Sequence, residues 1–186
     1  MYILASASPR RRELISHIID DFKVVVSEIE ETCPEEIELF KRPEFLSVKK
    51  AEDIAIRYND DIIISADTAV FLDDKMLGKP KNKEDAFLML KSLSGRKHKV
   101  ITGCCIIKGN KKHSFSVATD VEFYELTERE IEDYIAKNES FDKAGGYGIQ
   151  GKGCVLVKGI EGDYFNVVGL PVAELHKQLV SFEKNA

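Results

Sequence analysis

The sequence predicts an α/β protein with a mixed sheet and helices between its strands. Strand-like runs alternate with helical patterns in the first half of the chain, an order typical of parallel pairing. Later, the runs 99–108 and 113–125 are joined by the turn-forming stretch GNKK, which predicts an antiparallel hairpin. Together, the two kinds of pairing indicate a mixed sheet.

The individual strands are predicted from their density of β-branched and aromatic side chains. The runs are 2–6, 22–26, 61–67, 69–72, 99–108, 113–125 and 154–160. Helices are predicted from apolar residues that recur at helical spacing. Their ranges are 9–18, 43–58, 83–93, 127–138 and 171–182.

Capping signals support several of these helices. Thr127 and Glu130 have the spacing of a capping box, in which each side chain bonds to the other residue's backbone N–H. Gly95 follows the helix at 83–93, and Pro171 is the first residue of the last helix, positions that these two residue types often take. The helix at 127–138 is therefore the clearest.

Composition describes a globular protein of one domain, residues 1–186. Of its residues, 44% are hydrophobic and 32% are charged, which excludes a disordered chain. The 27 Lys and Arg residues against 32 Asp and Glu give a net charge of −5. A general nucleic-acid surface or an anionic-membrane partner is therefore not expected, and any anion site must be local.

The N-terminal run leads into arginines, which is the wrong order for a signal peptide, and no apolar run is long enough to span a bilayer. We therefore expect a cytoplasmic protein. The cysteines lack metal-binding spacing and are interpreted as buried apolar residues, and the histidines are interpreted as structural. These residues are Cys33, Cys104, Cys105, Cys154, His17, His98, His113 and His176.

Three arginines follow one another where a strand turns into a helix, in ILASASPRRRELI. Ser8 is a candidate N-cap and Pro9 a natural first helical residue, so the arginines fill the first turn. Cations are disfavoured at that end of a helix by about 0.3–1 kcal/mol each. A bound phosphate would offset this, with Ser6 and Ser8 hydroxyls and guanidinium groups as donors. The alternative is an ordinary solvated basic turn.

An acidic residue ends an apolar strand in DIIISADT. Asp67 and Thr68 are expected at a carboxyl end of the sheet, where α/β proteins tend to build their sites. The carboxylate could bind Mg²⁺ or orient a water, and Glu31, from an acidic run, could join it on a cation. The alternative for Asp67 is a turn residue that caps its own backbone.

Two loops offer further candidates. Lys79 lies between Gly78 and Pro80, a rigid setting that could direct its ammonium at a phosphate or leave it in solvent. The stretch DKAGGYGIQGKG formally matches G-x-G-x-x-G but follows a helix and precedes a strand, so it is not a dinucleotide fingerprint. Its Gln150 amide and Tyr147 ring would suit a nucleobase, unless the loop is only a structural turn.

Read together, these stretches resemble the Maf family of nucleoside triphosphate pyrophosphatases, part of the inosine-triphosphatase-like superfamily. The resemblance covers nearly the whole chain and rests on eight motifs in the family's order. They are S-x-S-P-R-R from Ser6 to Arg11, EIEET, KKAEDIA, SADTAV, LGKPK, LSGRKHKVITG, DKAGGYGIQG and VVGLPV. The loop AGGYGIQG is similar to the branch that acts on dTTP and UTP.

The resemblance implies a role for each matching residue. Asp67 is implied as the catalytic carboxylate, Glu31 as its neighbour on a Mg²⁺ or Mn²⁺ ion, and Gln150 as a base contact. The implied phosphate ligands are Ser6, Ser8, Arg10, Arg11, Lys50 and Lys79. Arg12 falls outside the motif. Asn82 stands where the family often has an aspartate, which puts an acidic role there in doubt.

The resemblance also implies a strongly twisted sheet flanked by helices, and two lobes with a central cleft in an elongated molecule, often a homodimer. The implied reaction is hydrolysis of a nucleoside triphosphate to the monophosphate and pyrophosphate. One alternative is a non-catalytic nucleotide-binding regulator of septum formation and cell division. Another, a dinucleotide-dependent oxidoreductase, rests only on the misplaced glycine match.

Overall fold

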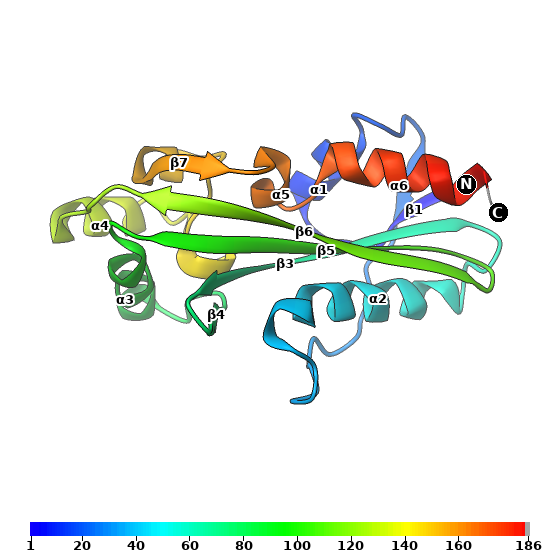
Figure 1. Ribbon diagram of the computed structural model, residues 1–186, viewed down its shortest axis with the longest axis horizontal. Coiled ribbons are helices and arrows are strands. Elements are labelled where there is room, and N and C mark those ends of the chain that lie inside the picture. Colours follow the sequence, from blue (N-terminus) through cyan, green and yellow to red (C-terminus); the bar gives the residue numbers. More distant parts are fainter. Residues whose placement is uncertain (185–186) are drawn as a thin grey trace. The chain divides into compact units, whose positions relative to one another are not determined.

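The computed structural model describes residues 1–184, whose strands form one mixed, seven-stranded sheet (Figure 1). Strand β1 pairs in parallel with β2 and β3, whereas β4 pairs antiparallel with β3 and β7 antiparallel with β6. The order is β2 (Phe22–Val24), β1 (Tyr2–Leu4), β3 (Ile62–Leu72), β5 (Lys97–Lys108), β6 (Lys111–Phe123) and β7 (Val157–Glu161), with β4 (Lys75–Leu77) beside β3. The predicted mixed sheet is confirmed.

Helices connect and flank these strands. They are α1 (Pro9–Ile15), α2 (Arg42–Ala55), α3 (Lys83–Leu93), α4 (Glu128–Ile135), α5 (Tyr164–Val168) and α6 (Val172–Lys184). The described residues also form the short 3₁₀ turns η1 (Leu39–Lys41), η2 (Ala144–Gly146) and η3 (Lys152–Leu156). Within residues 1–184, none of these helices has both the length and the apolar character that a membrane span requires.

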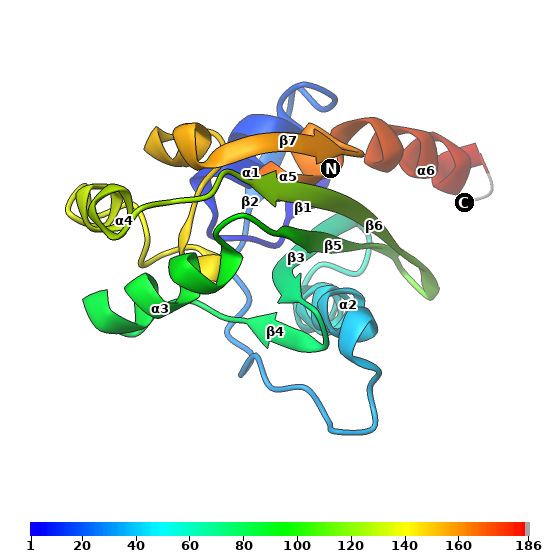
Figure 2. The ribbon, with the colours of Figure 1, turned by 60° about the vertical axis from the view of Figure 1, so that its left-hand side comes forward.

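The chain divides into two compact units, each with its own core. The first unit comprises residues 1–68, 102–117 and the described residues from Gly169 onward. Its core includes Ile3 of β1, Ile63 of β3 and Ile54 of α2, each fully buried. Figures 1 and 2 show α2 and α6 on opposite faces of the strands of this unit.

A glycine lets α2 approach the sheet closely. A Cβ atom at Gly103 of β5 would lie 2.2 Å from the backbone nitrogen of Glu44, in the first turn of α2. No side chain can be accommodated at that distance, so glycine is required here. The contact fixes the position of the N-terminal end of α2 on the sheet.

The second unit comprises residues 69–101 and 118–168. Phe123 of β6, Leu90 of α3 and Tyr134 of α4 meet in its core, and α3 packs against α4. The predicted capping box begins α4, because the Thr127 side chain accepts from the Glu130 N–H while the Glu130 carboxylate accepts from the Thr127 N–H. This cap is confirmed.

Several element boundaries differ from the predictions. The two runs predicted at 61–67 and 69–72 are one strand, β3 (Ile62–Leu72), because no glycine or proline interrupts the chain around Thr68. Residues 154–156, predicted to begin the last strand, belong instead to η3 (Lys152–Leu156), since the glycines before and within this segment favour turns. The short elements β4 and α5 were not predicted.

The hairpin prediction is confirmed, with a tighter connection than expected. Strands β5 and β6 are neighbours joined by two residues, Gly109 and Asn110, and Gly109 has the left-handed φ of 55° that tight hairpin turns require. The single domain over residues 1–186 and the central cleft stay predictions.

Candidate active site

A hydrogen bond between α2 and β3 holds together the two elements that carry the candidate site in the first unit. The buried Ser65 hydroxyl donates to the Ser47 carbonyl over 2.6 Å. Lys50 lies on the same face of α2 as Ser47, and Asp67 lies on the same face of β3 as Ser65, because of the helix and strand periodicities. Fixing one pair therefore brings the next pair, Lys50 and Asp67, together.

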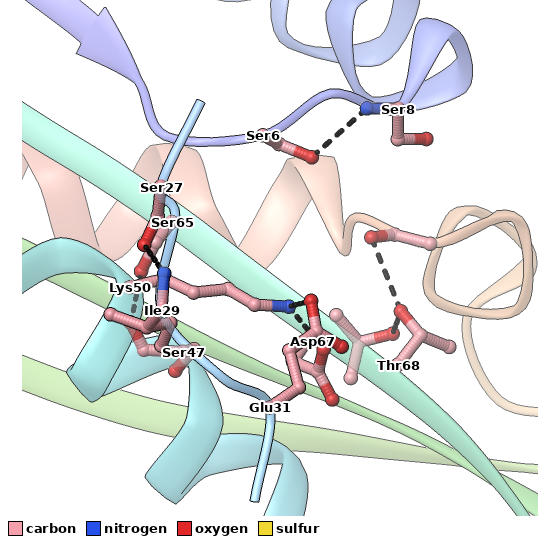
Figure 3. A network of polar contacts seen from close by, with 12 residues as sticks. Ser6, Ser8, Ser27, Ile29, Glu31, Ser47, Lys50, Ser65, Asp67 and Thr68 are labelled. Atoms are coloured by element: carbon pink, nitrogen blue, oxygen red, sulfur yellow. Dashed lines mark hydrogen bonds and ion pairs between the residues drawn. The ribbon is translucent and has the colours of Figure 1, made fainter. Parts of the chain in front are cut away.

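The Lys50 ammonium lies between two carboxylates (Figure 3). Its Nζ is 2.6 Å from Asp67 Oδ1 and 2.8 Å from Glu31 Oε1. The Lys50 and Asp67 side chains are only 11% and 14% exposed, whereas Glu31 is 58% exposed. Asp67 and Glu31, the two residues predicted at a cation site, are thus brought together, and Lys50, predicted as a phosphate ligand, lies between them. Two carboxylates facing one cation are also a donor set that a hard divalent cation accepts.

The predicted place of Asp67 in its strand is wrong. Asp67 does not end a strand but lies in the middle of β3. The neighbouring strand β1 ends at Leu4, whose partner is Ile64, so Asp67 lies beyond the carboxyl end of that neighbour. The carboxyl end of a strand, where the prediction placed Asp67, is therefore that of β1. Strand β3, which carries Asp67, continues beyond the end of β1.

The two serines after β1 organise the start of α1. The Ser8 hydroxyl accepts from the Arg11 N–H over 3.4 Å, which confirms Ser8 as the N-cap, and Pro9 begins the helix. The Ser6 hydroxyl accepts from the Ser8 N–H over 3.2 Å. Each hydroxyl still has a proton to donate to an anion. The phosphate site itself stays a prediction, as does the role of Arg10.

Arg11 is held in place by residues far apart in the sequence. Its Nε–H donates to the Gly169 carbonyl over 2.8 Å and its Nη2 to the Thr68 hydroxyl over 2.9 Å. Its Nη1 is 3.4 Å from Ser6 Oγ. Burial lowers the pKa of the guanidinium, and the nearby Asp67 carboxylate opposes that shift. Arg11 is therefore a fixed cation beside the Asp67 carboxylate, and Arg12 is exposed.

Sequence reasoning gave no role to Thr102 or Gly169. Thr102 Oγ1 is 2.9 Å from Thr68 Oγ1, and Gly169 holds its carbonyl toward Arg11 at a φ of 130°, which favours glycine. Both residues stand in stretches quoted above, VITG and VVGLPV, but a lone threonine and a lone glycine carry no chemical signal in a sequence.

The other two predicted site residues lie in the second unit. Lys79 and Gln150 are both exposed. Their loops are joined, because the Gly145 N–H donates to the Gly78 carbonyl over 3.0 Å. Gly145 and Gly146 both have left-handed φ angles, 70° and 74°, which explains the paired glycines. The roles of Lys79 and Gln150 stay predictions.

The expectation that the Tyr147 ring faces a nucleobase is wrong. Tyr147 is 5% exposed and packs edge-on against Phe123 and His98, so its ring is part of the core. Its hydroxyl lies 2.6 Å from His98 Nε2. The aromatic residue therefore anchors the glycine-rich loop rather than offering a stacking surface.

His98 is buried and neutral. Burial lowers its pKa to about 4, from an ordinary value near 6.5. In the unfolded chain His98 is consequently protonated below about pH 6.5, whereas in the folded chain it is protonated only below about pH 4. We expect stability to fall as the pH drops through this window, by up to about 3 kcal/mol.

Urea unfolding at pH 7 and pH 5 measures this effect. The variant His98→Gln should lose part of the pH dependence, with the exposed His176→Gln as the matched control. Equal pH dependence in the wild type and His98→Gln would show that His98 does not cause the acid sensitivity.

Asn82, where the family often has aspartate, has a structural role. Its Oδ1 accepts from the Asp85 N–H over 2.8 Å and caps α3. The Asp85 carboxylate in turn accepts from the Lys81 N–H over 2.9 Å. Asparagine and aspartate cap helices equally well, so the replacement keeps this cap.

Comparison with known proteins finds the family that the sequence motifs resemble, and the match includes every candidate site residue. The family model for "Maf-like protein" matches residues 1–182. A Bacillus cereus protein named dTTP/UTP pyrophosphatase is 47% identical over 186 residues, covering 97% of this chain and 95% of its own. A protein of the same name from Carboxydothermus hydrogenoformans is 48% identical over 182 residues, covering 95% of each chain.

Solved structures match the fold at low identity. A HAM1 protein from Coxiella burnetii aligns with a TM-score of 0.54 and 12% identity, covering 97% of this chain and 98% of its own. The Staphylococcus aureus Ham1 protein aligns with a TM-score of 0.50 and 16% identity, covering 67% of this chain and 72% of its own. These likenesses confirm the predicted fold class.

Proposed function

The chain belongs to the Maf-like protein family, and we propose that it hydrolyses dTTP and UTP to the monophosphate and pyrophosphate. The observation that carries the chemistry is the cluster of Lys50, Asp67 and Glu31 beside the fixed Arg11 guanidinium. The choice of dTTP and UTP is supported by the names of the relatives, which share nearly half of their residues with this chain.

In the proposed reaction, a water oxygen forms a bond to the α-phosphorus while the bond from that phosphorus to the α–β bridging oxygen breaks. Pyrophosphate leaves with the bridging oxygen, and the water gives up a proton. The negative triphosphate repels the incoming water oxygen, so the protein must hold the attack in line and neutralise charge.

We assign Asp67 to the attacking water. Lys50 contacts Oδ1 of this carboxylate, and the second oxygen can orient a water and accept its proton. The contact also restricts rotation of the carboxylate, which directs that second oxygen. Arg11 and Arg10 are assigned to the phosphate oxygens, where guanidinium groups bind in a fork geometry.

The charges of this cluster support a divalent metal requirement. Arg10, Arg11 and Lys50 contribute three positive charges, against two negative charges from Asp67 and Glu31. A triphosphate brings several negative charges, which this small surplus does not balance. Asp67 and Glu31 would hold a Mg²⁺ or Mn²⁺ ion, which supplies Lewis-acid stabilisation of phosphate oxygens when bound.

The test is a panel of ordinary and modified nucleoside triphosphates with Mg²⁺ or Mn²⁺, in which the products are separated. We expect pyrophosphate, rather than orthophosphate, and the highest kcat/KM with dTTP or UTP. Nucleotide binding without any hydrolysis across the panel would contradict the proposal and favour a regulatory protein instead.

Gln150→Ala tests base recognition by the glycine-rich loop. An exposed amide offers both a donor and an acceptor, which can match the edge of a pyrimidine. We expect the ratio of kcat/KM for UTP to that for GTP to fall about tenfold, as a lost hydrogen bond of about 1.4 kcal/mol predicts. An equal loss with every nucleotide would rule out base recognition by this residue.

We also propose that the protein acts on free nucleotides in the cytoplasm as a homodimer. The net charge of −5 disfavours binding to nucleic acid or an anionic membrane, which supports a small-molecule substrate. Light scattering of the purified protein at several concentrations measures the oligomeric state, and a constant monomer mass would contradict the dimer.

A further inference from the structure

Two threonine hydroxyls in the first unit form a connection behind Arg11. Thr68 follows Asp67 on β3, and Thr102 is fully buried on β5. Their hydroxyl oxygens are 2.9 Å apart, and Thr68 Oγ1 is also 3.4 Å from the Gly169 carbonyl (Figure 3 shows Thr68 with its contacts). No part of the proposed reaction requires these hydroxyls directly, which raises the question of what they do.

The direction of these hydrogen bonds follows from the donor inventory. A guanidinium can only donate, so the Thr68 hydroxyl accepts from Arg11 Nη2. The Thr68 proton must then point elsewhere, to Thr102 or to Gly169. In either case Thr102 restricts rotation of the Thr68 hydroxyl, because it is the nearer of these two partners.

Arg11 has a limited number of donors left. Among the contacts described for residues 1–184, three of its five N–H groups point at Gly169, Thr68 and Ser6. The remaining donors can reach a phosphate only in directions that these three contacts determine. A guanidinium held at its Nε and Nη2 atoms cannot rotate without breaking both of the shorter bonds.

We propose that Thr102 is a positioning residue for the hydrolysis of the triphosphate. Through Thr68, it fixes the guanidinium of Arg11 in the direction that stabilises charge developing on the phosphate oxygens. This inference rests on the proposed function. It predicts an effect on kcat from a buried hydroxyl that touches neither substrate nor reacting atoms.

Two substitutions at position 102 separate positioning from packing. Thr102→Val keeps the shape and removes the hydroxyl, whereas Thr102→Ser keeps the hydroxyl and removes a methyl group. We expect Thr102→Val to lower kcat about tenfold with dTTP, since small misplacements of a catalytic group are costly, and to change KM less. Thr102→Ser should restore kcat to within about twofold of the wild type.

Thr119→Val is the matched control. Thr119 is a buried threonine of β6 in the second unit, and its hydroxyl bonds to Asp163 and Asn166. The substitution removes a hydrogen-bonded hydroxyl in the same way, so the Tm should fall while kcat stays at the wild-type value. Circular dichroism and Tm are measured for every variant.

A reversed order at position 102, with Thr102→Val active and Thr102→Ser impaired, would overturn the inference in favour of a packing role. If Thr102→Val does not fold, Thr68→Val tests the same connection at a half-buried site, and wild-type kcat in that variant would also overturn it. A wild-type protein that releases no pyrophosphate would instead refute the proposed function itself.

Discussion

Asp67→Asn is expected to lower kcat for dTTP or UTP by about a thousandfold while leaving the fold intact. The amide has nearly the same shape as the carboxylate, but it carries no negative charge and cannot accept a proton from water. The loss of a general base contributes roughly 10²–10⁴ in rate. Because Asp67 would also hold the proposed cation, we expect the effect to be at least in the middle of that range.

The stability of Asp67→Asn should change much less. The Asn side-chain oxygen can still accept from the Lys50 ammonium, which also keeps its contact with Glu31. We expect a decrease of about 1–2 kcal/mol in the free energy of unfolding, because a charge-assisted hydrogen bond becomes a neutral one. Pyrophosphate release and urea unfolding measure the two effects separately.

Asp73→Asn is the control for this substitution. Asp73 directly follows β3, and its exposed carboxylate pairs with Arg96 at 2.8 Å. The substitution therefore removes a negative charge close to β3 without changing the candidate site. It should keep wild-type kcat. Activity in Asp67→Asn that matches Asp73→Asn, in the presence of metal, would remove Asp67 from the mechanism.

Arg11→Ala is expected to lower kcat/KM by roughly 10²–10³, the effect of removing one donor that stabilises developing charge. The matched control is Arg12→Ala, since Arg12 is the adjacent arginine of α1 and is exposed. Its kcat/KM should equal that of the wild type. Initial-rate kinetics with dTTP compare the two variants under identical conditions.

Arg11→Ala should also reduce stability, because it leaves the Gly169 carbonyl and the Thr68 hydroxyl without this partner. A decrease of about 1–3 kcal/mol in the free energy of unfolding is expected. Arg11→Lys adds a second test, since lysine keeps the charge but lacks the fork. Recovery of full activity in Arg11→Lys would show that charge, rather than the fixed fork geometry, is what the site uses.

Much of the fold could be predicted because local signals agree with the tertiary structure. The capping box at Thr127 and the cap at Ser8 were visible because a helix start depends on residues three apart or fewer. The continuity of β3 was missed at Asp67 and Thr68, where polar residues interrupt an apolar run. Their polarity serves the candidate site, and local patterns cannot distinguish a site residue from a strand end.

The candidate site was predicted as a set of residues but not as an arrangement. Glu31, Lys50 and Asp67 are far apart in the sequence, and their contact depends on how α2 lies on β3, which the Ser65–Ser47 hydrogen bond fixes. Tyr147 was misjudged because an aromatic residue in a glycine-rich loop looks exposed until its core partners are known.

The Lys50 ammonium between Glu31 and Asp67 also bears on how the chain folds. With Arg11 beside Asp67, two cationic and two anionic side chains of the chain itself offset one another. The carboxylates of Asp67 and Glu31, which would otherwise repel each other, can thus approach during folding because cations of the same chain lie beside them. This site can consequently fold before any metal ion binds.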